Sequence, residues 1–166
     1  FLDKYKPLNQ KIASAMITNE TFLNAVASRK IHTYISTGMT TPLMIDNAIK
    51  IFKEKNCDFT LMHSVSTYPC PPEKLNLNNI LFLLILHESS PAPSAFAASL
   101  GATCIERHIT LDRTMYGSDQ AASLEESGLK ILVDMVRLLQ VTLGKERTDI
   151  YPEEIPIAKK LRYWQK

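Results

Sequence analysis

The feature that most constrains the fold of this chain is a regular spacing of short apolar segments typical of buried strands. These segments begin near residues 11, 33, 59, 81 and 103, so that about 20 to 25 residues separate each start from the next. That distance is the length of one strand and one helix in a repeating βα unit. The spacing therefore predicts an α/β fold with a parallel sheet, either doubly wound or closed as a barrel.

The segments between the predicted strands carry helical signals. Asn19 can cap one helix, and Thr41 followed by Pro42 can begin another. A short helix of about two turns is expected over 73–80, and small residues favour a further helix over 91–100. Each of these helices falls between two predicted strands, as a βα repeat requires.

The longest helix is expected near the C-terminus. Ser123 and Glu126 form a capping-box pattern at its start, and Gly144 can end it. A further short helix is predicted over 153–162. The whole chain, 1–166, is expected to form a single domain.

Polar side chains gather where the predicted strands end. In both parallel architectures, ligands bind at the carboxyl ends of the strands. The motif GxGxxG follows none of the strands, which argues against a dinucleotide-binding fold. The residues at strand ends are Ser14, Ser36, Ser64, Ser66 and His108.

Composition narrows the class of protein. Hydrophobic residues make up 45% and charged residues 22% of the chain, and the net charge is +2. We therefore expect neither nucleic acid nor a membrane as partner. The three cysteines show no CxxC pair, so we expect a reducing cytoplasm. Since the chain starts at Phe1 without a signal-peptide pattern, we expect that Phe1 is not a natural start.

Four histidines are candidates for chemistry. His32 precedes a strand and is expected at the surface, whereas His63 is expected to be a satisfied core or supporting residue. His87 and His108 each end a predicted strand, about one βα unit apart, so they could share a divalent metal. From spacing alone, the interpretation as two ordinary structural histidines is favoured, because two histidines are a weak metal signal.

Five sequence blocks together form a more specific pattern. The longest is GATCIERHITLDRTMYGSDQAASLE at 101–125, and the others are KIASAMITN at 11–19, ISTGM at 35–39, SVSTYPCP at 64–71 and HESS at 87–90. The blocks resemble the signatures of the sialic acid synthase family, which includes N-acetylneuraminate synthases and spore coat polysaccharide synthases. They follow the family's order and spacing over nearly the whole chain.

The resemblance implies a fold and a reaction. The family fold is a (β/α)8 TIM-type barrel followed by a small antifreeze-like domain; this chain is similar to strands four to eight with their helices, and the antifreeze-like domain is expected to be absent. The family condenses phosphoenolpyruvate with N-acetylmannosamine or a related N-acylated amino sugar and releases phosphate. A divalent metal, Mn²⁺ or else Mg²⁺, polarises the sugar aldehyde as a Lewis acid.

The resemblance also implies roles for particular residues. His87 and His108 would be the metal ligands. Lys11 and Ser14 would bind the phosphate of phosphoenolpyruvate, and Ser36 and Ser66 its carboxylate.

Two further residues, Tyr68 and Asp119, would hydrogen-bond the amino sugar. Without the motifs, the serines could simply make turns, Lys11 could be a solvated lysine and Asp119 a loop residue. By alternation, Glu106 and Arg107 are expected to point away from His108 and to form a supporting ion pair.

Two departures from the family pattern affect what the chain can bind. Met16 stands where the family has an acidic residue facing the sugar, and methionine is a much weaker hydrogen-bond acceptor. Before His87, the run 81–86 replaces a strand with glycine and serine, so that Ile85 stands where a phosphate-binding serine is expected.

Three functional hypotheses follow. The first is a sialic-acid-type synthase, expected as a homodimer. The second is a related synthase or aldolase on the same barrel, including enzymes for legionaminic or pseudaminic acid precursors. The third is a non-catalytic, truncated or degenerate barrel fragment, in which unpaired sheet edges drive self-association.

Overall fold

The computed structural model describes residues 2–67, 69–79, 83–86, 90–145, 149–162 and 164, with backbone alone at 2–3, 79 and 83–86. Its centre is a five-stranded parallel sheet in the order β1-β2-β3-β4-β5. The strands are β1 (Gln10–Ile12), β2 (Thr33–Ser36), β3 (Phe59–Ser64), β4 (Leu83–Leu86) and β5 (Cys104–Arg107). All five lie where the spacing of apolar segments predicted them.

The strand order decides between the two predicted architectures. A doubly wound sheet reverses direction at a switch point, whereas the described strands follow one another in sequence order without a reversal. The register is continuous, with Ile12 beside Ile35, Ile35 beside Leu61 and Leu86 beside Arg107. The fold is therefore α/β with a singly wound parallel sheet.

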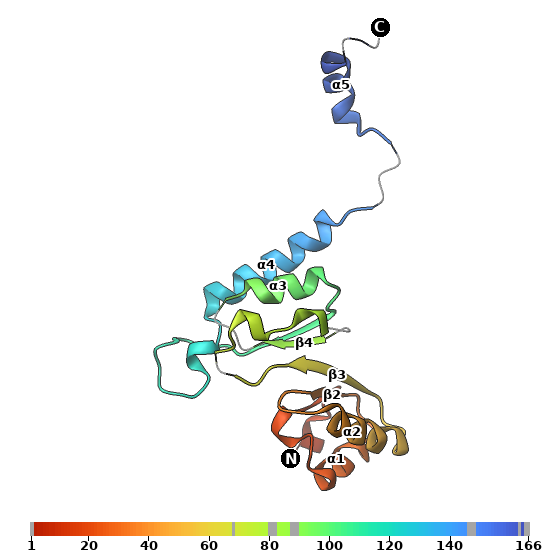
Figure 1. Ribbon diagram of the computed structural model, residues 1–166, viewed down its shortest axis with the longest axis vertical. Helices are drawn as coiled ribbons and strands as arrows, with labels where there is room; N and C mark the ends of the chain where they lie inside the picture. Colours follow the sequence, from red (N-terminus) through yellow and green to blue (C-terminus); the bar gives the residue numbers. More distant parts are fainter. Residues whose placement is uncertain are drawn as a thin grey trace.

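The described helices, apart from the last, cover one face of this sheet. The helices are α1 (Glu20–Ala27), α2 (Pro42–Glu54), α3 (Ala92–Ser99), α4 (Glu126–Thr142) and α5 (Ile155–Leu161). The pair α1 and α2 and the pair α3 and α4 lie at opposite ends of the sheet (Figure 1). Among the described residues, none of these helices has both the length and the apolar character that a bilayer span requires.

Two helix starts form as the sequence predicted. The Asn19 side chain accepts a hydrogen bond from the Phe22 amide at 3.0 Å, and Thr41 caps α2 with Pro42 in its first turn. Each cap satisfies an amide that the helix itself leaves without an acceptor. Gly144, with φ of +56°, follows the end of α4, as expected of a C-terminal glycine.

Two other helical predictions are wrong. Glu125 caps α4 without a side-chain bond, and the Ser123 hydroxyl instead donates to the Asp119 carbonyl at 2.7 Å. The segment 73–80 forms two separate 3₁₀ turns, Pro72–Lys74 and Leu77–Asn79, in place of a helix. Leu75 between these turns is buried, so tertiary packing interrupts the helical pattern.

The main core lies between the sheet and the first two helices. Ile12 and Ile35 point from the strands toward Leu23 of α1 and Phe52 of α2, and all four are buried. Phe52 also meets Phe59 edge-on, with the ring centroids 5.6 Å apart. Burial of such side chains contributes about 1.5 to 3 kcal/mol each, so this cluster fixes α1 and α2 on β1 and β2.

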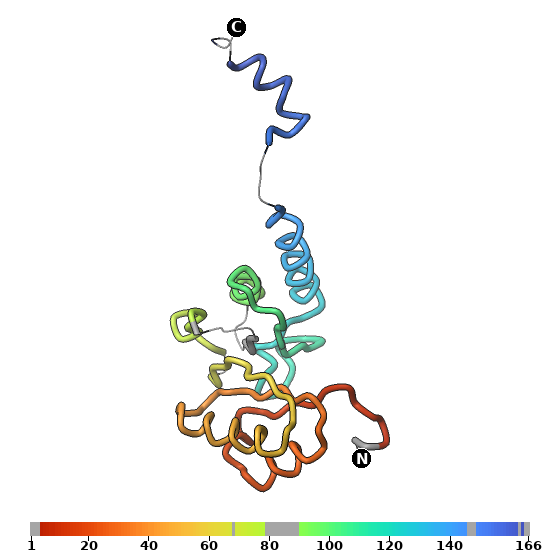
Figure 2. Tube along the Cα trace, turned by 90° about the vertical axis from the view of Figure 1, so that its right-hand side faces the viewer, coloured from red at the N-terminus to blue at the C-terminus, as the bar shows by residue number. Residues whose placement is uncertain are grey.

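The C-terminal helix stands apart from the rest of the molecule. Figures 1 and 2 show α5 separated from α4 and far from the sheet. Its apolar residues Ile155, Ile157 and Leu161 are exposed. The short helix predicted over 153–162 is thus confirmed as the 3₁₀ turn Pro152–Glu154 followed by α5, but it adds nothing to the core.

Candidate active site

The side chains of interest lie on the sheet face opposite to the helices, which we call the site face. Strand residues alternate between faces, and residues paired in a parallel register share a face. Ile12 and Ile35 face the helices, so Lys11, Ser36 and Glu106 lie on the site face. Met62, Tyr34 and Cys104 pack together on it, which places β2, β3 and β5 around one concave surface.

Lys11 connects three strands of the sheet. Its ammonium donates to the Ser36 hydroxyl at 3.1 Å and forms an ion pair with the Glu106 carboxylate at 3.0 Å. Lys11 and Glu106 lie on the first and last strands, which in a flat five-stranded sheet would be roughly 19 Å apart. An extended lysine and glutamate cannot bridge that distance, so the sheet is strongly curved around the site face.

Glu106 is the residue that sequence reasoning placed wrongly. It was predicted to point away from His108, yet it lies on the site face in contact with Lys11. Alternation has a period of two, so residues 106 and 108 share a face while 107 has the opposite one. Alternation along the strand therefore predicts that Arg107 points away from His108, but it does not predict this for Glu106.

Three loops after neighbouring strands meet at a second group of polar atoms. The Gly38 amide donates to the Ser14 hydroxyl at 3.0 Å. A Cβ atom placed on Gly38 would clash with both the Ser66 and the Ser14 hydroxyls. The absence of a side chain at residue 38 therefore lets two hydroxyls approach the backbone closely, and together with the amide they form a group of donors suited to an anion.

His108 is held by an acidic side chain. Its Nδ1 lies 3.2 Å from Oδ2 of Asp119. Asp119 returns to His108 because residues 108–110 pair with Leu124, through the bonds Leu124 N–H to His108 O and Thr110 N–H to Leu124 O, each 2.9 Å long. A carboxylate that accepts the Nδ1 proton fixes the ring and leaves the lone pair of a neutral imidazole on Nε2.

The contact between His108 and Asp119 fits the role of His108 as a metal ligand. Metal-binding histidines commonly donate their other nitrogen to a carboxylate. Within the described ranges, no group of three or more His, Cys, Asp or Glu side chains could hold a metal. His87 and Tyr68 lie outside the described residues, so the two-histidine site and the tyrosine contact stay predictions.

Two further groups on the site face have unusual environments. Burial and the nearby charge of Glu106 raise the pKa of the Cys104 thiol. The Ser64 hydroxyl is buried, and within the described part of the chain it has no hydrogen-bond partner. Ser64 pairs in register with Ile85, the position where the family pattern has a serine. Its hydroxyl is a ligand candidate: the sequence placed Ser64 among the polar strand ends, but the family resemblance assigned it no role.

The remaining predictions concern residues outside this cluster. His63 is satisfied as expected, with Nε2 donating to the Leu75 carbonyl at 2.9 Å. His32 is half-buried instead of exposed, because Nε2 shares a hydrogen bond with the Thr60 hydroxyl and the ring packs edge-on to Tyr34. Met16 packs against the core.

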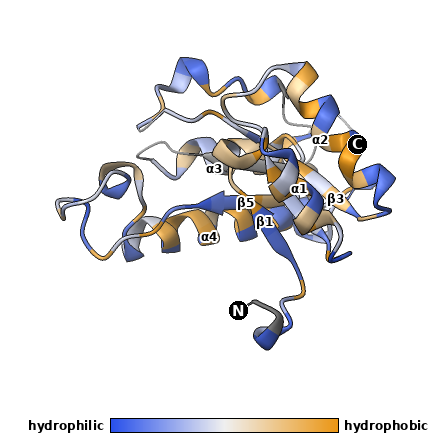
Figure 3. Ribbon diagram, turned by 90° about the horizontal axis from the view of Figure 1, so that it is seen from below, coloured by the Kyte–Doolittle hydropathy of each residue, from blue (hydrophilic) through white to orange (hydrophobic). Residues whose placement is uncertain are grey.

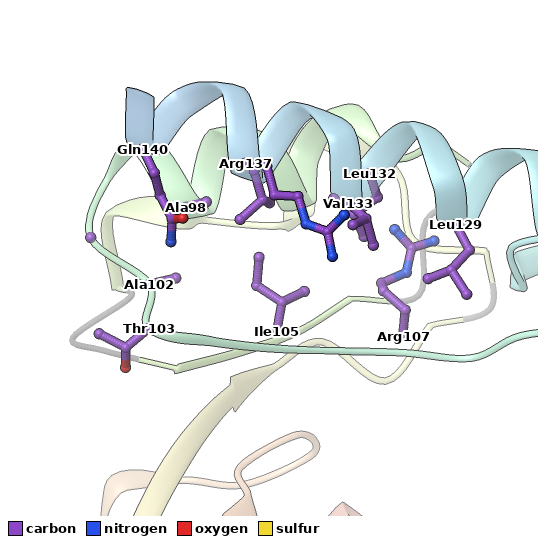
Figure 4. A pocket seen from close by; sticks show the side chains of 12 residues that line it. Ala98, Ala102, Thr103, Ile105, Arg107, Leu129, Leu132, Val133, Arg137 and Gln140 are labelled. Atoms are coloured by element: carbon purple, nitrogen blue, oxygen red, sulfur yellow. The ribbon is translucent and has the colours of Figure 1, made fainter. Parts of the chain in front are cut away.

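A pocket of about 860 Å³ lies away from this chemistry. Figure 4 shows its walls, with Leu129, Val133 and Arg137 of α4 facing Ile105 and Arg107 of β5. The side chains of Ile105 and Arg107 point to the face opposite to that of Glu106, so this pocket lies on the helical side of the sheet. It is a gap between α4 and the strand layer and does not include any of the predicted ligands.

The chain is similar in sequence to known proteins. The chain is 34% identical over 160 residues to pseudaminic acid synthase of Campylobacter jejuni, covering 90% of this chain and 47% of that protein. It is 37% identical over 161 residues to human N-acetylneuraminate-9-phosphate synthase, covering 91% and 45%. The chain thus spans about half the length of these relatives.

Solved structures show the same similarity. The N-acetylneuraminic acid synthetase of Leptospira borgpetersenii superposes with a TM-score of 0.78 at 31% identity, covering 97% of this chain and 61% of that one. A spore coat polysaccharide biosynthesis protein of Bacillus subtilis gives 0.77 at 28% identity, covering 93% and 46%. The model of the NeuB family matches residues 1–148. The chain therefore belongs to the NeuB family, as the sequence motifs indicated.

Proposed function

We propose that this chain supplies strands four to eight of a (β/α)8 barrel that condenses phosphoenolpyruvate with an N-acylated amino sugar. Family membership supports the reaction class, since the relatives are synthases of sialic and pseudaminic acids. The ion pair between Lys11 and Glu106 carries the proposal. It requires a sheet curved enough to belong to a barrel, and it puts a cation at the concave face.

Phosphoenolpyruvate is a compact anion that requires several donors. In the proposal, Lys11 and Ser14 bind its phosphate, and Ser36 and Ser66 bind its carboxylate. The hydroxyls of Ser14 and Ser66 beside Gly38 support this assignment, as does the contact of the Lys11 ammonium with the Ser36 hydroxyl. Glu106 balances the Lys11 charge until the substrate phosphate takes its place.

The amino sugar would bind near His108. His87 and His108 would hold a divalent ion, Mn²⁺ or Mg²⁺, which when bound polarises the sugar aldehyde. The pairing of Leu86 with Arg107 supports this, because in the sequence each of the two histidines directly follows one of these paired residues. Asp119 keeps the Nδ1 proton of His108 in place and, with Tyr68, is the proposed hydrogen-bonding partner of the sugar.

The proposed reaction joins C3 of phosphoenolpyruvate to the aldehyde carbon. Water adds at C2, and the C–O bond to phosphate breaks as phosphate leaves. The chain's contribution is to orient two substrates and to hold the leaving phosphate against Lys11. Met16 packs against the core and offers no carboxylate. The proposed sugar site therefore lacks one hydrogen-bond acceptor that the family pattern supplies. For this reason precursors of legionaminic and pseudaminic acids stay among the candidate sugars.

The deciding experiment measures phosphate release from phosphoenolpyruvate by the complete gene product. Mn²⁺ and a panel of aldehyde substrates are supplied, including N-acetylmannosamine and precursors of legionaminic and pseudaminic acids. We expect sugar-dependent release that His108→Ala abolishes. The matched control is His32→Ala, a histidine at the opposite end of the strands, which should retain turnover. Undiminished release by His108→Ala would overturn the metal assignment.

A second candidate is a non-catalytic fragment that self-associates. In the described sheet, β1 and β5 each have one unpaired edge, and proteins rarely leave such edges uncovered. The proposed homodimer is compatible with both the synthase and the non-catalytic fragment. A complete gene product that binds neither phosphoenolpyruvate nor Mn²⁺ but sediments as an oligomer would favour this alternative.

A further inference from the structure

Ser64 ends β3 with a buried hydroxyl on the site face. It lies two residues beyond Met62, which packs on that face with Tyr34 and Cys104, so alternation directs Ser64 to the same side. Ser64 is 6% exposed, and among the described residues its hydroxyl has no hydrogen-bond partner. A buried hydroxyl without a partner destabilises a protein, because it loses its bonds to water without replacing them. A bound ligand that supplies the missing bond would explain why such a group is present.

The register of the sheet places Ser64 in the same row as Glu106. Both residues pair with Ile85 of β4, one from each side, and strand residues paired in this way share a face. In a flat sheet their Cα atoms would be roughly 9.5 Å apart, twice the spacing of neighbouring strands. Because the sheet curves around the site face, side chains on this face converge. The carboxylate and the buried hydroxyl therefore belong to the same part of the site face.

The ammonium of Lys11 lies next to this row. It contacts Glu106 at 3.0 Å and Ser36 at 3.1 Å. Ser36 pairs with Met62, two residues before Ser64. Lys11 thus contacts one residue in the row of Ser64 and one in the adjacent row. Since β3 is the middle strand of the curved sheet, its site face is directed toward the ion pair that joins the two end strands.

We propose that the Ser64 hydroxyl donates a hydrogen bond to the phosphate of phosphoenolpyruvate. The inference rests on the proposed function, in which that phosphate takes the place of Glu106 beside Lys11. A hydroxyl suits this partner, because it donates to an anionic oxygen without adding charge to the site. As the phosphate enters and the ion pair opens, the buried hydroxyl gains a charged acceptor.

The test measures the affinity of the complete gene product for phosphoenolpyruvate by calorimetry, without sugar. We expect Ser64→Ala to weaken binding about tenfold or more, since a hydrogen bond to a charged group is lost. Inorganic phosphate, the second probe, should lose affinity for this variant by a similar factor. The unfolding temperature of the ligand-free variant should be unchanged or higher, because a buried polar group has been removed.

The matched control is Ser94→Ala. Ser94 is also a buried serine, but its hydroxyl accepts from Arg107 Nη1 at 3.0 Å, within α3 and away from the site face. We expect the opposite pattern for this variant, with a lower unfolding temperature and unchanged affinity for phosphoenolpyruvate. Ser64→Cys keeps nearly the same volume but donates only weakly, so it should bind phosphoenolpyruvate about as poorly as Ser64→Ala. It decides the question if Ser64→Ala does not fold.

The outcomes separate this inference from the proposed function. If Ser64→Ala keeps its affinity for phosphoenolpyruvate, the inference is refuted, and a lower unfolding temperature would then show that the hydroxyl has a structural role. If phosphoenolpyruvate binds more weakly but inorganic phosphate does not, the contact with the phosphate is refuted. Lys11→Met tests the phosphate site itself: unchanged binding of phosphoenolpyruvate there would reject the proposed function, whatever the Ser64 variants do.

Discussion

At the residue scale, the site face is organised around a cation and its neutralising carboxylate. Lys11 contacts Glu106 and Ser36, and both charged side chains are about one third exposed, at 31% and 37%. A pair with that exposure contributes little to stability, on the order of 1 kcal/mol or less. Its value is positional, because it keeps a single ammonium at the concave face where an anionic substrate would bind.

The Cys104 thiol can report on the Glu106 charge. Burial is the larger cause of its raised pKa and Glu106 the smaller, so its thiolate forms only at higher pH than for an ordinary cysteine. We expect the pH profile of Cys104 alkylation to be displaced upward. Glu106→Gln should shift this profile partway back toward lower pH and raise the rate of Cys104 alkylation at pH 8. Mass spectrometry of iodoacetamide-treated protein measures this, with Asp134→Asn on α4 as the control; a profile that does not change in Glu106→Gln would contradict the assignment.

A substitution at Gly38 tests the proposed anion-binding group of Ser14 and Ser66 directly. The φ of Gly38 is not in the left-handed region, so alanine adds no backbone strain there, but the new Cβ would collide with the Ser14 and Ser66 hydroxyls. We expect Gly38→Ala to raise the KM for phosphoenolpyruvate at least tenfold while Mn²⁺ affinity stays unchanged. Gly128→Ala, whose Cβ would meet only Leu124 side-chain atoms at 3.3 Å or more, is the matched control. Equal KM values for the two variants would argue against a substrate at this position.

At the element scale, local signals placed α1 and α2 well, because a side chain just before each helix caps its first turn. The Asn19 cap bond is 3.0 Å long, whereas the Thr41 bond is 3.4 Å. The helix predicted over 73–80 does not form, because backbone groups in this segment make tertiary contacts. Leu75 is buried, and its carbonyl accepts from His63 instead of closing a helical turn.

The difference between the two caps predicts a difference in stability. Asn19→Ala should lower the free energy of unfolding by about 1 kcal/mol, because the Phe22 amide loses its acceptor. Thr41→Ala should cost less, since its bond is longer. Urea denaturation followed by circular dichroism measures both. Asn47→Ala, an exposed position inside α2, should be neutral or slightly stabilising, and a cost there equal to that of Asn19→Ala would show that capping is not the cause.

At the scale of the whole molecule, the curved sheet leaves surface that its own helices do not cover. Ile131, Met135, Leu138 and Val141 form an exposed apolar stripe along α4 at helical spacing. Figure 3 shows apolar and polar residues interleaved along this helix. Apolar stripes of this kind mark contact surfaces. The chain's span of about half its relatives agrees with a surface that other barrel elements would cover.

The stripe predicts how the 166-residue chain behaves by itself. We expect concentration-dependent self-association in sedimentation velocity, since exposed apolar surface and unpaired strand edges attract further copies. Leu138→Glu should shift the distribution toward monomer. Leu111→Glu, in an exposed loop away from α4, should leave it unchanged. If both variants behave alike, association depends on the strand edges and not on α4.

The sequence by itself determined the positions of the five strands along the chain, the caps of α1 and α2, and the family. These depend on apolar spacing and on hydrogen bonds within a few residues, so a linear pattern records them. Only the tertiary structure decided that Lys11 meets Glu106, that Asp119 holds His108 and that Arg107 anchors α3. Such contacts join residues up to 95 positions apart. They depend on the curvature of the sheet and on the paths of its loops, which alternation and local propensity do not specify.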